Sequence, residues 1–160
     1  MASSLKHSFQ RSFLGDLGNF VVFDPKRLEV SLREHPRENA TLLPITFTSV
    51  HRIVSLTDNY RKFGLIKTDG DEGWARLKHV HPAARIVPKD PKREHIKVRI
   101  NPDPERKNFL EDDRKKPIEV ARDQLVAVLG FEGEMVRVGF RTTTGSSATG
   151  WVKRENMHRS

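Results

Sequence analysis

The sequence has no cysteine, and this absence excludes several kinds of chemistry. Disulfides, thiolate catalysis, iron–sulfur ligation and cysteine-based zinc sites all need that residue. Long apolar runs are missing as well, because none approaches the roughly 20 residues that a transmembrane helix requires. The sequence therefore predicts no membrane span and a fold that does not depend on an oxidising compartment.

Acidic residues are absent from the first segment, which runs from Met1 to Leu14. This segment has basic residues and serines, and Leu5, Phe9 and Phe13 repeat at helical spacing. Such a composition is typical of an organellar transit peptide, and it lacks the continuous apolar core of a secretory signal. The alternative is an amphipathic N-terminal helix that docks on the rest of the chain. We expect an intracellular, cytoplasmic protein, with mitochondrial import as the alternative.

Positive charge outweighs negative charge in this chain of 160 residues. The formal net charge is +8 and the sequence pI is about 10.0. Basic proteins are attracted to polyanions such as RNA, DNA, acidic lipids or acidic protein surfaces. The other interpretation is that dispersed lysines and arginines simply keep the protein in solution.

Short apolar runs separated by turn signals predict an all-β protein. The predicted strands cover residues 19–23, 28–32, 52–56, 62–67, 124–129 and 134–141. A further strand is predicted at 95–100, where apolar and basic residues alternate. Turns are predicted at 57–60 and 130–133, and 142–149 is predicted to be a flexible hairpin loop.

Two Gly-Trp pairs contain the only tryptophans of the chain. Gly73-Trp74 is followed by Ala75, Gly150-Trp151 is followed by Val152, and a basic residue comes next in both cases. A strand, a strand with an internal glycine and a polar hairpin precede each pair, which favours an internal duplication. The tryptophans are predicted to be packing anchors, with stacking on a ligand as the alternative.

This arrangement resembles the bacterial-type Src-homology-3-like β-barrel. In that family a Gly-Trp-Val element ends a hairpin, enters the last strands and precedes one 3₁₀ turn. The residues that match the pattern are Gly150, Trp151, Val152 and Met157, and, less closely, Gly73, Trp74, Ala75 and Val80. The aromatic-rich runs of the eukaryotic peptide-binding members are absent, so a groove for proline-rich ligands is not expected.

The resemblance implies two tandem small barrels. We expect an N-terminal extension with short strands at 1–41 and a first barrel at 42–88. A charged linker with one strand at 89–117 and a second barrel at 118–160 complete the predicted organisation. The strand inside the linker is expected to pack on one of the barrels.

No catalytic motif is recognisable, because the chain has neither a phosphate loop nor an evident Ser/His/Asp set. His79 and His81 share one side of an extended segment, but zinc usually takes four protein ligands or three and a water. Glu111-Asp112-Asp113 could bind a divalent cation, although the basic residues that follow favour a solvated linker. We therefore predict no enzyme, no cofactor and no metal site.

The function that we expect is a non-catalytic interaction module, either a protein-binding adaptor or a structural subunit, whose partner has an acidic surface. The alternative is a basic RNA- or DNA-binding protein, for example a ribonucleoprotein component, which would neutralise phosphates without reading bases. The candidate binding residues are basic side chains on strand faces and hairpins together with four aromatic side chains: Arg61, Lys62, Lys67, Arg76, Lys78, Lys97, Arg99, Arg137, Arg141, Lys153 and Arg154, with Tyr60, Phe63, Trp74 and Trp151.

Overall fold

The computed structural model describes residues 20–26, 29–48, 54–68, 71–103, 105–106 and 108–157. The regular elements in these ranges are β-strands and two short 3₁₀ turns, so the predicted all-β fold is confirmed. The predicted N-terminal targeting segment lies outside the described residues. Within the described ranges, no helix has the length and apolar character needed to cross a membrane.

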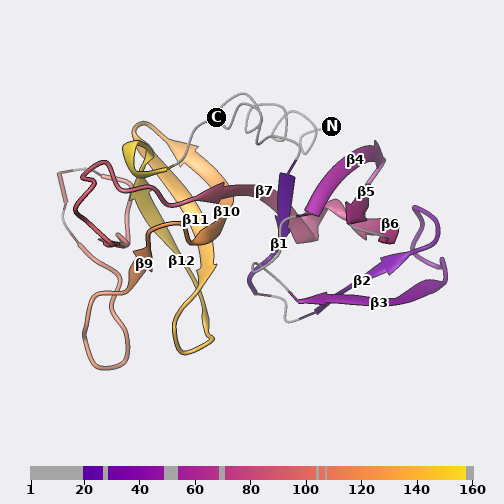
Figure 1. Cartoon of the computed structure of the whole chain (residues 1–160), viewed down its shortest axis with the longest axis horizontal. Coiled ribbons are helices and arrows are strands. Elements are labelled where there is room, and N and C mark those ends of the chain that lie inside the picture. The colour runs from indigo at the N-terminus through magenta and orange to yellow at the C-terminus, as the bar shows by residue number, and fades with distance from the viewer. Residues whose placement is uncertain are drawn as a thin grey trace.

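The described strands form two halves that lie side by side (Figure 1). The first half contains β1 (Phe20–Phe23), β2 (Glu29–Arg33), β3 (Leu42–Thr48), β4 (Val54–Tyr60), β5 (Phe63–Thr68) and β6 (Asp71–Arg76). Turn η2 (Leu77–His79) then leads into β7 (Val80–Arg85). The second half contains β8 (His95–Lys97), β9 (Glu119–Ala121), β10 (Leu125–Glu132), β11 (Met135–Arg141), β12 (Ser147–Lys153) and turn η3 (Arg154–Asn156).

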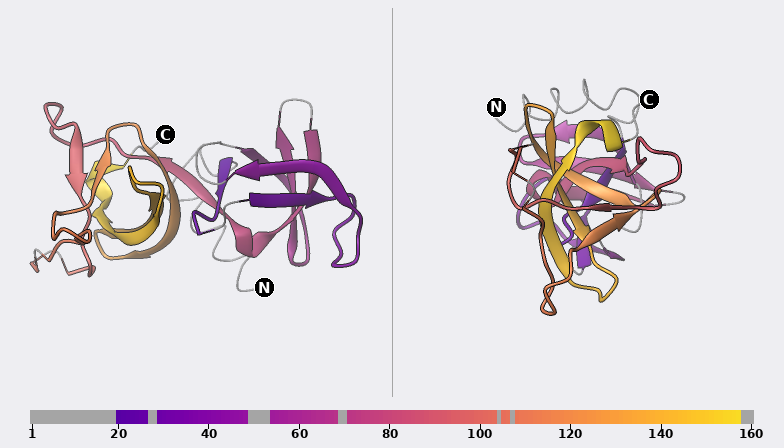
Figure 2. Two further views of the ribbon diagram at one scale, coloured as in Figure 1. Left: turned by 90° about the horizontal axis from the view of Figure 1, so that it is seen from below. Right: turned by 90° about the vertical axis from the view of Figure 1, so that its left-hand side faces the viewer.

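Strand β7 belongs to both halves. It pairs antiparallel with β1, where Val80 faces Phe23, and antiparallel with β10, where Ala84 faces Val126. One continuous sheet therefore has the order β12-β11-β10-β7-β1-β4-β5-β6-β2-β3, while β8 and β9 form a separate pair. The view from below shows β7 passing from one half into the other (Figure 2).

Each half has its own buried apolar cluster. The first cluster contains Phe23, Val30, Leu32, Leu56, Ile66, Ala75, Leu77 and Val80. The second contains Ala84, Ile86, Ile96, Val98, Val120, Val126, Val128, Val136, Val138, Phe140, Val152 and Met157. A third, smaller cluster of Val22, Ala83 and Ala127 lies on β1, β7 and β10, where the halves meet. Burial of these side chains supplies the main stabilisation of the fold.

The Gly-Trp pair of the first half lies where β2 meets β6. Trp74 is the pairing partner of Arg33. A Cβ added to Gly73 would stand 2.7 Å from the Cβ of Leu32 and 2.7 Å from Cδ1 of Leu43. Glycine is therefore required here by the close approach of two strands.

The Gly-Trp pair of the second half repeats this geometry. Trp151 of β12 exchanges backbone hydrogen bonds with Arg99, at N···O distances of 2.8 and 2.9 Å. A Cβ added to Gly150 would overlap the side chain of Val98 and lie 2.9 Å from the carbonyl oxygen of Arg99. An apolar-Arg pair thus crosses a Gly-Trp pair in both halves.

A 3₁₀ turn follows each Gly-Trp strand. The backbone N–H of Val80 donates to the carbonyl of Leu77 at the end of η2, and that of Met157 donates to Arg154 at the end of η3. The residues after the two turns have nearly the same backbone angles, φ −123° and ψ 142° against φ −120° and ψ 144°. The order hairpin, Gly-Trp strand and 3₁₀ turn therefore occurs twice.

The segments expected to be an extension and a linker contribute to the two cores. Strand β1 pairs with β4, and strand β2 pairs with β3. These two strands bury Phe23 and Leu32 in the first half, although the segment 1–41 is expected from the sequence to lie outside the first barrel. Ile96 and Val98, inside the expected linker 89–117, are buried in the second cluster. That strand therefore packs in the second cluster, and its alternating apolar residues explain the burial, since every second side chain faces the core.

Two predicted turns lie later in the chain than expected, at Arg61-Lys62 and at Gly133-Glu134. Strand β4 runs to Tyr60, and β10 runs through Gly130 to Glu132. Both contain an irregular register, between Leu56 and Asp58 and between Val128 and Gly130. A β-bulge accommodates turn-forming residues without ending a strand.

The predicted loop at 142–149 is shorter than expected. Strand β12 begins at Ser147, and it pairs with β11 from that residue to Lys153. Gly150-Trp151 therefore lies near the end of β12. The turn itself is closed by the N–H of Thr142, which donates to the carbonyl of Ser146 at 2.8 Å.

Candidate functional site

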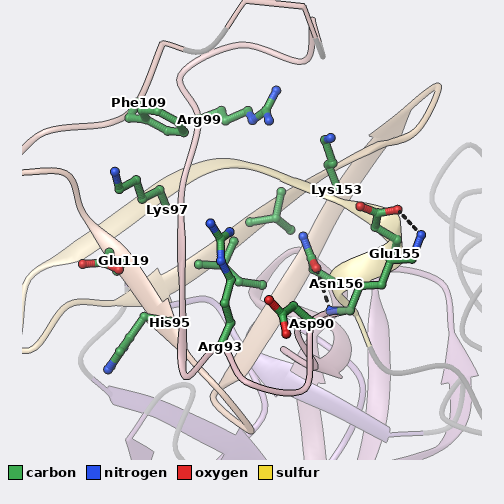
Figure 3. A pocket seen from close by; sticks show the side chains of 13 residues that line it. Asp90, Arg93, His95, Lys97, Arg99, Phe109, Glu119, Lys153, Glu155 and Asn156 are labelled. Atoms are coloured by element: carbon green, nitrogen blue, oxygen red, sulfur yellow. Dashed lines mark hydrogen bonds and ion pairs between the residues drawn. The ribbon is translucent and has the colours of Figure 1, made fainter.

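A groove of about 760 Å³ lies in the second half, between β8 on one side and the end of β12 with η3 on the other (Figure 3). Ile96 and Val152, which belong to the second buried cluster, form its apolar floor, and polar residues supply most of the rest of the lining. The lining residues are Lys89, Asp90, Arg93, His95, Ile96, Lys97, Arg99, Phe109, Glu119, Val152, Lys153, Glu155 and Asn156.

The groove exists because two strands separate. Arg99 and Trp151 are paired, and continuing that antiparallel register would place Lys97 opposite Lys153. Among the described residues, however, β8 pairs only with β9, and the chain after Lys153 enters η3. The two backbones thus diverge beyond the Arg99–Trp151 pair and leave an open space.

Cationic side chains come to this groove from three parts of the chain. Lys97 and Arg99 come from β8 and the residues after it, Lys153 comes from the end of β12, and Lys89 and Arg93 come from the segment that follows β7. In Figure 3, Lys97 and Arg99 lie on one side of the groove and Lys153 lies on the other. Their positive charges surround one volume, so an anion inside it would meet several of them at once.

Phe109 provides an aromatic face beside two of these cations. The Lys97 Nζ atom lies 5.3 Å from the centre of its ring, and the Arg99 guanidinium carbon lies 6.0 Å from it. Phe109 itself is partly buried and forms an isolated bridge with Arg99. These cation–π contacts hold the basic side chains near the mouth of the groove.

Carboxylates are present among the cations. Asp90, Glu119 and Glu155 also line the groove. Glu155 lies 3.5 Å from the Lys89 ammonium, and both side chains are well exposed. An exposed pair of this kind stabilises little, but it marks the groove as one of mixed charge with an excess of positive groups.

Arg122 holds the wall of the groove formed by residues 90–93. Its Nη2 atom donates to the carbonyl oxygens of Asp90, Pro91 and Arg93, at 3.3, 3.0 and 2.5 Å. Its Nε atom also lies 3.5 Å from the Glu94 carboxylate. The planar guanidinium can serve several acceptors at once, so it fixes the segment that carries Arg93.

Turn η3 holds the other end of this segment. The backbone N–H of Lys89 donates to the side-chain oxygen of Asn156 at 2.9 Å, and the N–H of Val87 donates to the Asn156 carbonyl at 2.8 Å. Lys89 and the end of β12 are therefore kept on the same side of the groove.

The structure brings together Lys97, Arg99 and Lys153 from the predicted set and leaves the other basic residues elsewhere. Three of those others have structural partners. Arg76 is paired with Glu38, Arg141 donates to the Gly145 carbonyl at 2.7 Å, and Arg154 donates to the Gly133 carbonyl at 2.9 Å. The remaining predicted cations are exposed outside the groove: Arg61, Lys62, Lys67, Lys78 and Arg137.

The expectation that Phe63 contacts a ligand is wrong. Phe63 is only 5% exposed, so it is a core residue and offers no ligand contact. Trp74 and Trp151 are partly buried and lie outside the fully buried clusters. The buried positions of their strands are the neighbours on each side, because alternate residues of a strand face opposite sides. Tyr60 is 49% exposed, its ring lies 5.4 Å from the Arg61 guanidinium carbon, and it lines a second, smaller pocket that shares no residue with the groove.

No metal centre is found among the described residues, where no three histidine or acidic side chains gather. His81 is half-buried in β7 and lies 3.6 Å from the Asp24 carboxylate. Asp112 caps a turn, since its Oδ1 atom accepts the N–H groups of Arg114 and Lys116 at 2.8 and 2.9 Å. The bond from Lys116 is the main reason that the pKa of the Asp112 carboxyl is lowered from its ordinary value.

Sequence reasoning missed Lys89, Arg93 and Phe109. All three lie in the segment 89–117, which is expected to be a solvated linker. Charge runs of this kind are usually exposed to solvent. One signal was available, because Phe109 is an isolated aromatic residue in a charged segment.

Comparisons with known proteins give no family for this chain. No family model matches it, and a search of the curated proteins finds no match. Among solved structures, NlpC2 from Trichomonas vaginalis matches with a TM-score of 0.31 and 13% identity, over 89% of this chain and 48% of that one. An NlpC/P60 family protein from Bacillus cereus matches with a TM-score of 0.30 and 12% identity, over 88% and 57%. The chain thus spans about half the length of these proteins.

The prediction that the chain is not an enzyme is wrong in the light of this comparison. The two matched structures are named NlpC2 and NlpC/P60, and that family consists of peptidases and other hydrolases. At these TM-scores and identities the match assigns neither an activity nor a catalytic residue to this chain. The site is therefore described by its own residues alone.

Proposed function

We propose that the chain is a binding protein that holds an acidic segment of a partner protein in the groove between β8 and β12. One observation carries this proposal: five cationic side chains from separate parts of the chain surround a single groove with an aromatic side and an apolar floor. Complementary charge gives such a site its selectivity and its rate of association.

The mixed charge of the groove favours a protein partner over a nucleic acid. A phosphate backbone would pass close to Asp90, Glu119 and Glu155, which line the same space and repel it. A peptide can place carboxylates beside the lysines and other side chains beside the acids. The exposed tyrosine that could stack on a base, Tyr60, lies outside the groove.

We also propose that each half is a small Src-homology-3-like barrel and that the two arose by duplication. The repeated order of hairpin, Gly-Trp strand and 3₁₀ turn supports this, as does the apolar-Arg pair that crosses each Gly-Trp pair. The basic groove is a feature of the second half. In the first half, the paired strand β2 carries Ser31 two positions before its crossing arginine, where β8 carries Lys97.

Direct titration of the full chain with a fluorescent peptide of alternating Glu and Val tests the proposed function, because such a peptide can place Val beside the carboxylates of the groove. Replacing both Lys97 and Lys153 by Glu should weaken binding at least about tenfold, because each reversal removes one attraction and adds one repulsion. The matched control replaces both Arg137 and Lys67 by Glu, which makes the same charge change at exposed positions of β11 and β5 outside the groove. An equal loss in the control, or tighter binding of a single-stranded oligonucleotide of matched charge, would contradict the proposal.

A further inference from the structure

We propose that the acidic segment binds in an extended conformation and adds a strand to β8, in the space where β8 and β12 diverge. This inference rests on the proposed function and concerns how the same groove recognises its partner. Its basis is the direction of backbone hydrogen-bonding groups on the two strands that border the groove.

The backbone of Lys97 faces away from β9. Ile96 is paired with Val120, and the hydrogen bonds on either side of it, from Arg122 to Glu94 and from Val98 to Ile118, place even-numbered residues of this segment in contact with β9. In an antiparallel ladder the donors and acceptors of successive residues point to opposite sides. The N–H and C=O groups of residues 95, 97 and 99 therefore point toward β12.

Arg99 confirms this direction, because it exchanges both backbone bonds with Trp151 of β12. Lys153 has the same orientation as Trp151, so its backbone also points away from β11 and toward the groove. Lys97 thus presents its N–H and C=O groups to this open space, and Lys153 presents its N–H group, since the Lys153 carbonyl is the N-cap acceptor of η3. No described strand fills the space. Strand edges of this kind accept an added peptide strand.

Side chains at the groove match an acidic extended peptide. Residues at alternate positions of a strand lie on one face, and side chains on paired strands stand opposite one another. Carboxylates at alternate positions would meet Lys97 from β8 and Lys153 from β12, and Arg93 lies between them in Figure 3. A groove of about 760 Å³ holds only a short segment, and the Arg99–Trp151 pair closes one end of it.

The experiment compares two forms of one fluorescent peptide of alternating Glu and Val, titrated into the full chain at low salt. The first form has an ordinary backbone, and the second carries N-methyl groups on alternate residues, which remove hydrogen-bond donors and keep every charge. Strand addition predicts a loss of affinity of about tenfold on N-methylation, because several backbone bonds are lost.

Two variants test the same point from the protein side. Lys97→Pro removes the groove-facing N–H and the charge, whereas Lys97→Gln removes the charge alone. Proline is tolerated on an edge strand where its nitrogen faces away from the pairing partner, as it does here. Strand addition predicts that Lys97→Pro binds the ordinary peptide several-fold more weakly than Lys97→Gln. If the proline variant unfolds, the N-methylated peptide still decides the question on the unaltered chain.

The outcomes separate the two proposals. Equal binding of both peptides, lost on reversal of Lys97 and Lys153, would overturn strand addition and leave the acidic-segment function standing. Failure of both peptides to bind at low salt, or their displacement by a matched oligonucleotide, would overturn both proposals.

Discussion

Gly150 has no side chain at a point where two strands of the second half cross. An added Cβ would overlap Val98 and press on the Arg99 carbonyl, and neither can move without disturbing the core or the Arg99–Trp151 pair. Gly73 occupies the corresponding place under Leu32. In both Gly-Trp pairs the glycine therefore allows the crossing strand to come close, while the tryptophan side chain lies on the other face of its strand.

Gly150→Ala should destabilise the fold by about 1–3 kcal/mol, the usual cost of overpacking a core. Gly130→Ala is the matched control, since a Cβ there would meet nothing within 4 Å. We expect that control to change the free energy of unfolding by less than about 0.5 kcal/mol. Urea denaturation followed by tryptophan fluorescence measures both, and similar losses in the two variants would show that the crossing does not constrain Gly150.

Arg122 is a positioning residue for the groove. Arg122→Lys keeps the charge but loses the planar fork that holds Nη2 against three carbonyls and Nε beside Glu94, so residues 90–93 should become less ordered. We expect faster amide exchange of Arg93 and binding of the alternating Glu-Val peptide weakened about threefold to tenfold, with little change in the thermal midpoint. Unchanged exchange at Arg93 would mean that other contacts hold this segment.

At the scale of elements, the apolar runs predicted most strands, because alternation and β-branched residues reflect burial directly. Two features were out of reach. Turn-forming residues in β4 and β10 occur inside bulged strands, and only the pairing partner determines whether a bulge forms. The groove depends on where β8 and β12 separate. These strands are distant in sequence, so no local sequence pattern indicates the point at which they separate. Of its cations, Lys97, Arg99 and Lys153 could be nominated, whereas Lys89 and Arg93 could not be told from a solvated charge run.

The hairpin loop after Glu111 should respond to acid. Hydrogen bonds to the Asp112 carboxylate, chiefly from Lys116, lower its pKa below the ordinary value of 3.8. A lowered pKa in the folded state means that this contribution is present above the ordinary value and is lost as the pH falls through the folded value. Amide shifts of Arg114 and Lys116 followed by NMR should move together below pH 3.8 in the wild type and stay constant in Asp112→Asn. A titration at or above that ordinary value would contradict the assignment.

At the scale of the whole molecule, β7 couples the two halves. It pairs with β1 and with β10, and small side chains such as Ala83 allow the strands to pack closely at the junction. Each half contains one tryptophan, so the two can be followed separately.

Ile66→Ala should therefore lower the stability of both halves. Ile66 is fully buried in the first cluster, and its truncation should cost about 2–5 kcal/mol. In a Trp74→Phe background, the fluorescence of Trp151 reports on the second half. Because β7 is shared, we expect the urea midpoint seen by Trp151 to fall in the Ile66→Ala variant. A constant midpoint would show that the halves unfold independently.

The most direct test of the central claim is an NMR titration of the 18.4 kDa chain with the alternating Glu-Val peptide. If the groove holds an acidic segment, the largest amide shift changes should fall on Lys97, Arg99, Lys153 and the segment 89–93, and they should weaken as salt rises. Small changes spread over the exposed basic residues, with Arg137 and Lys67 affected as much as Lys97, would contradict the account.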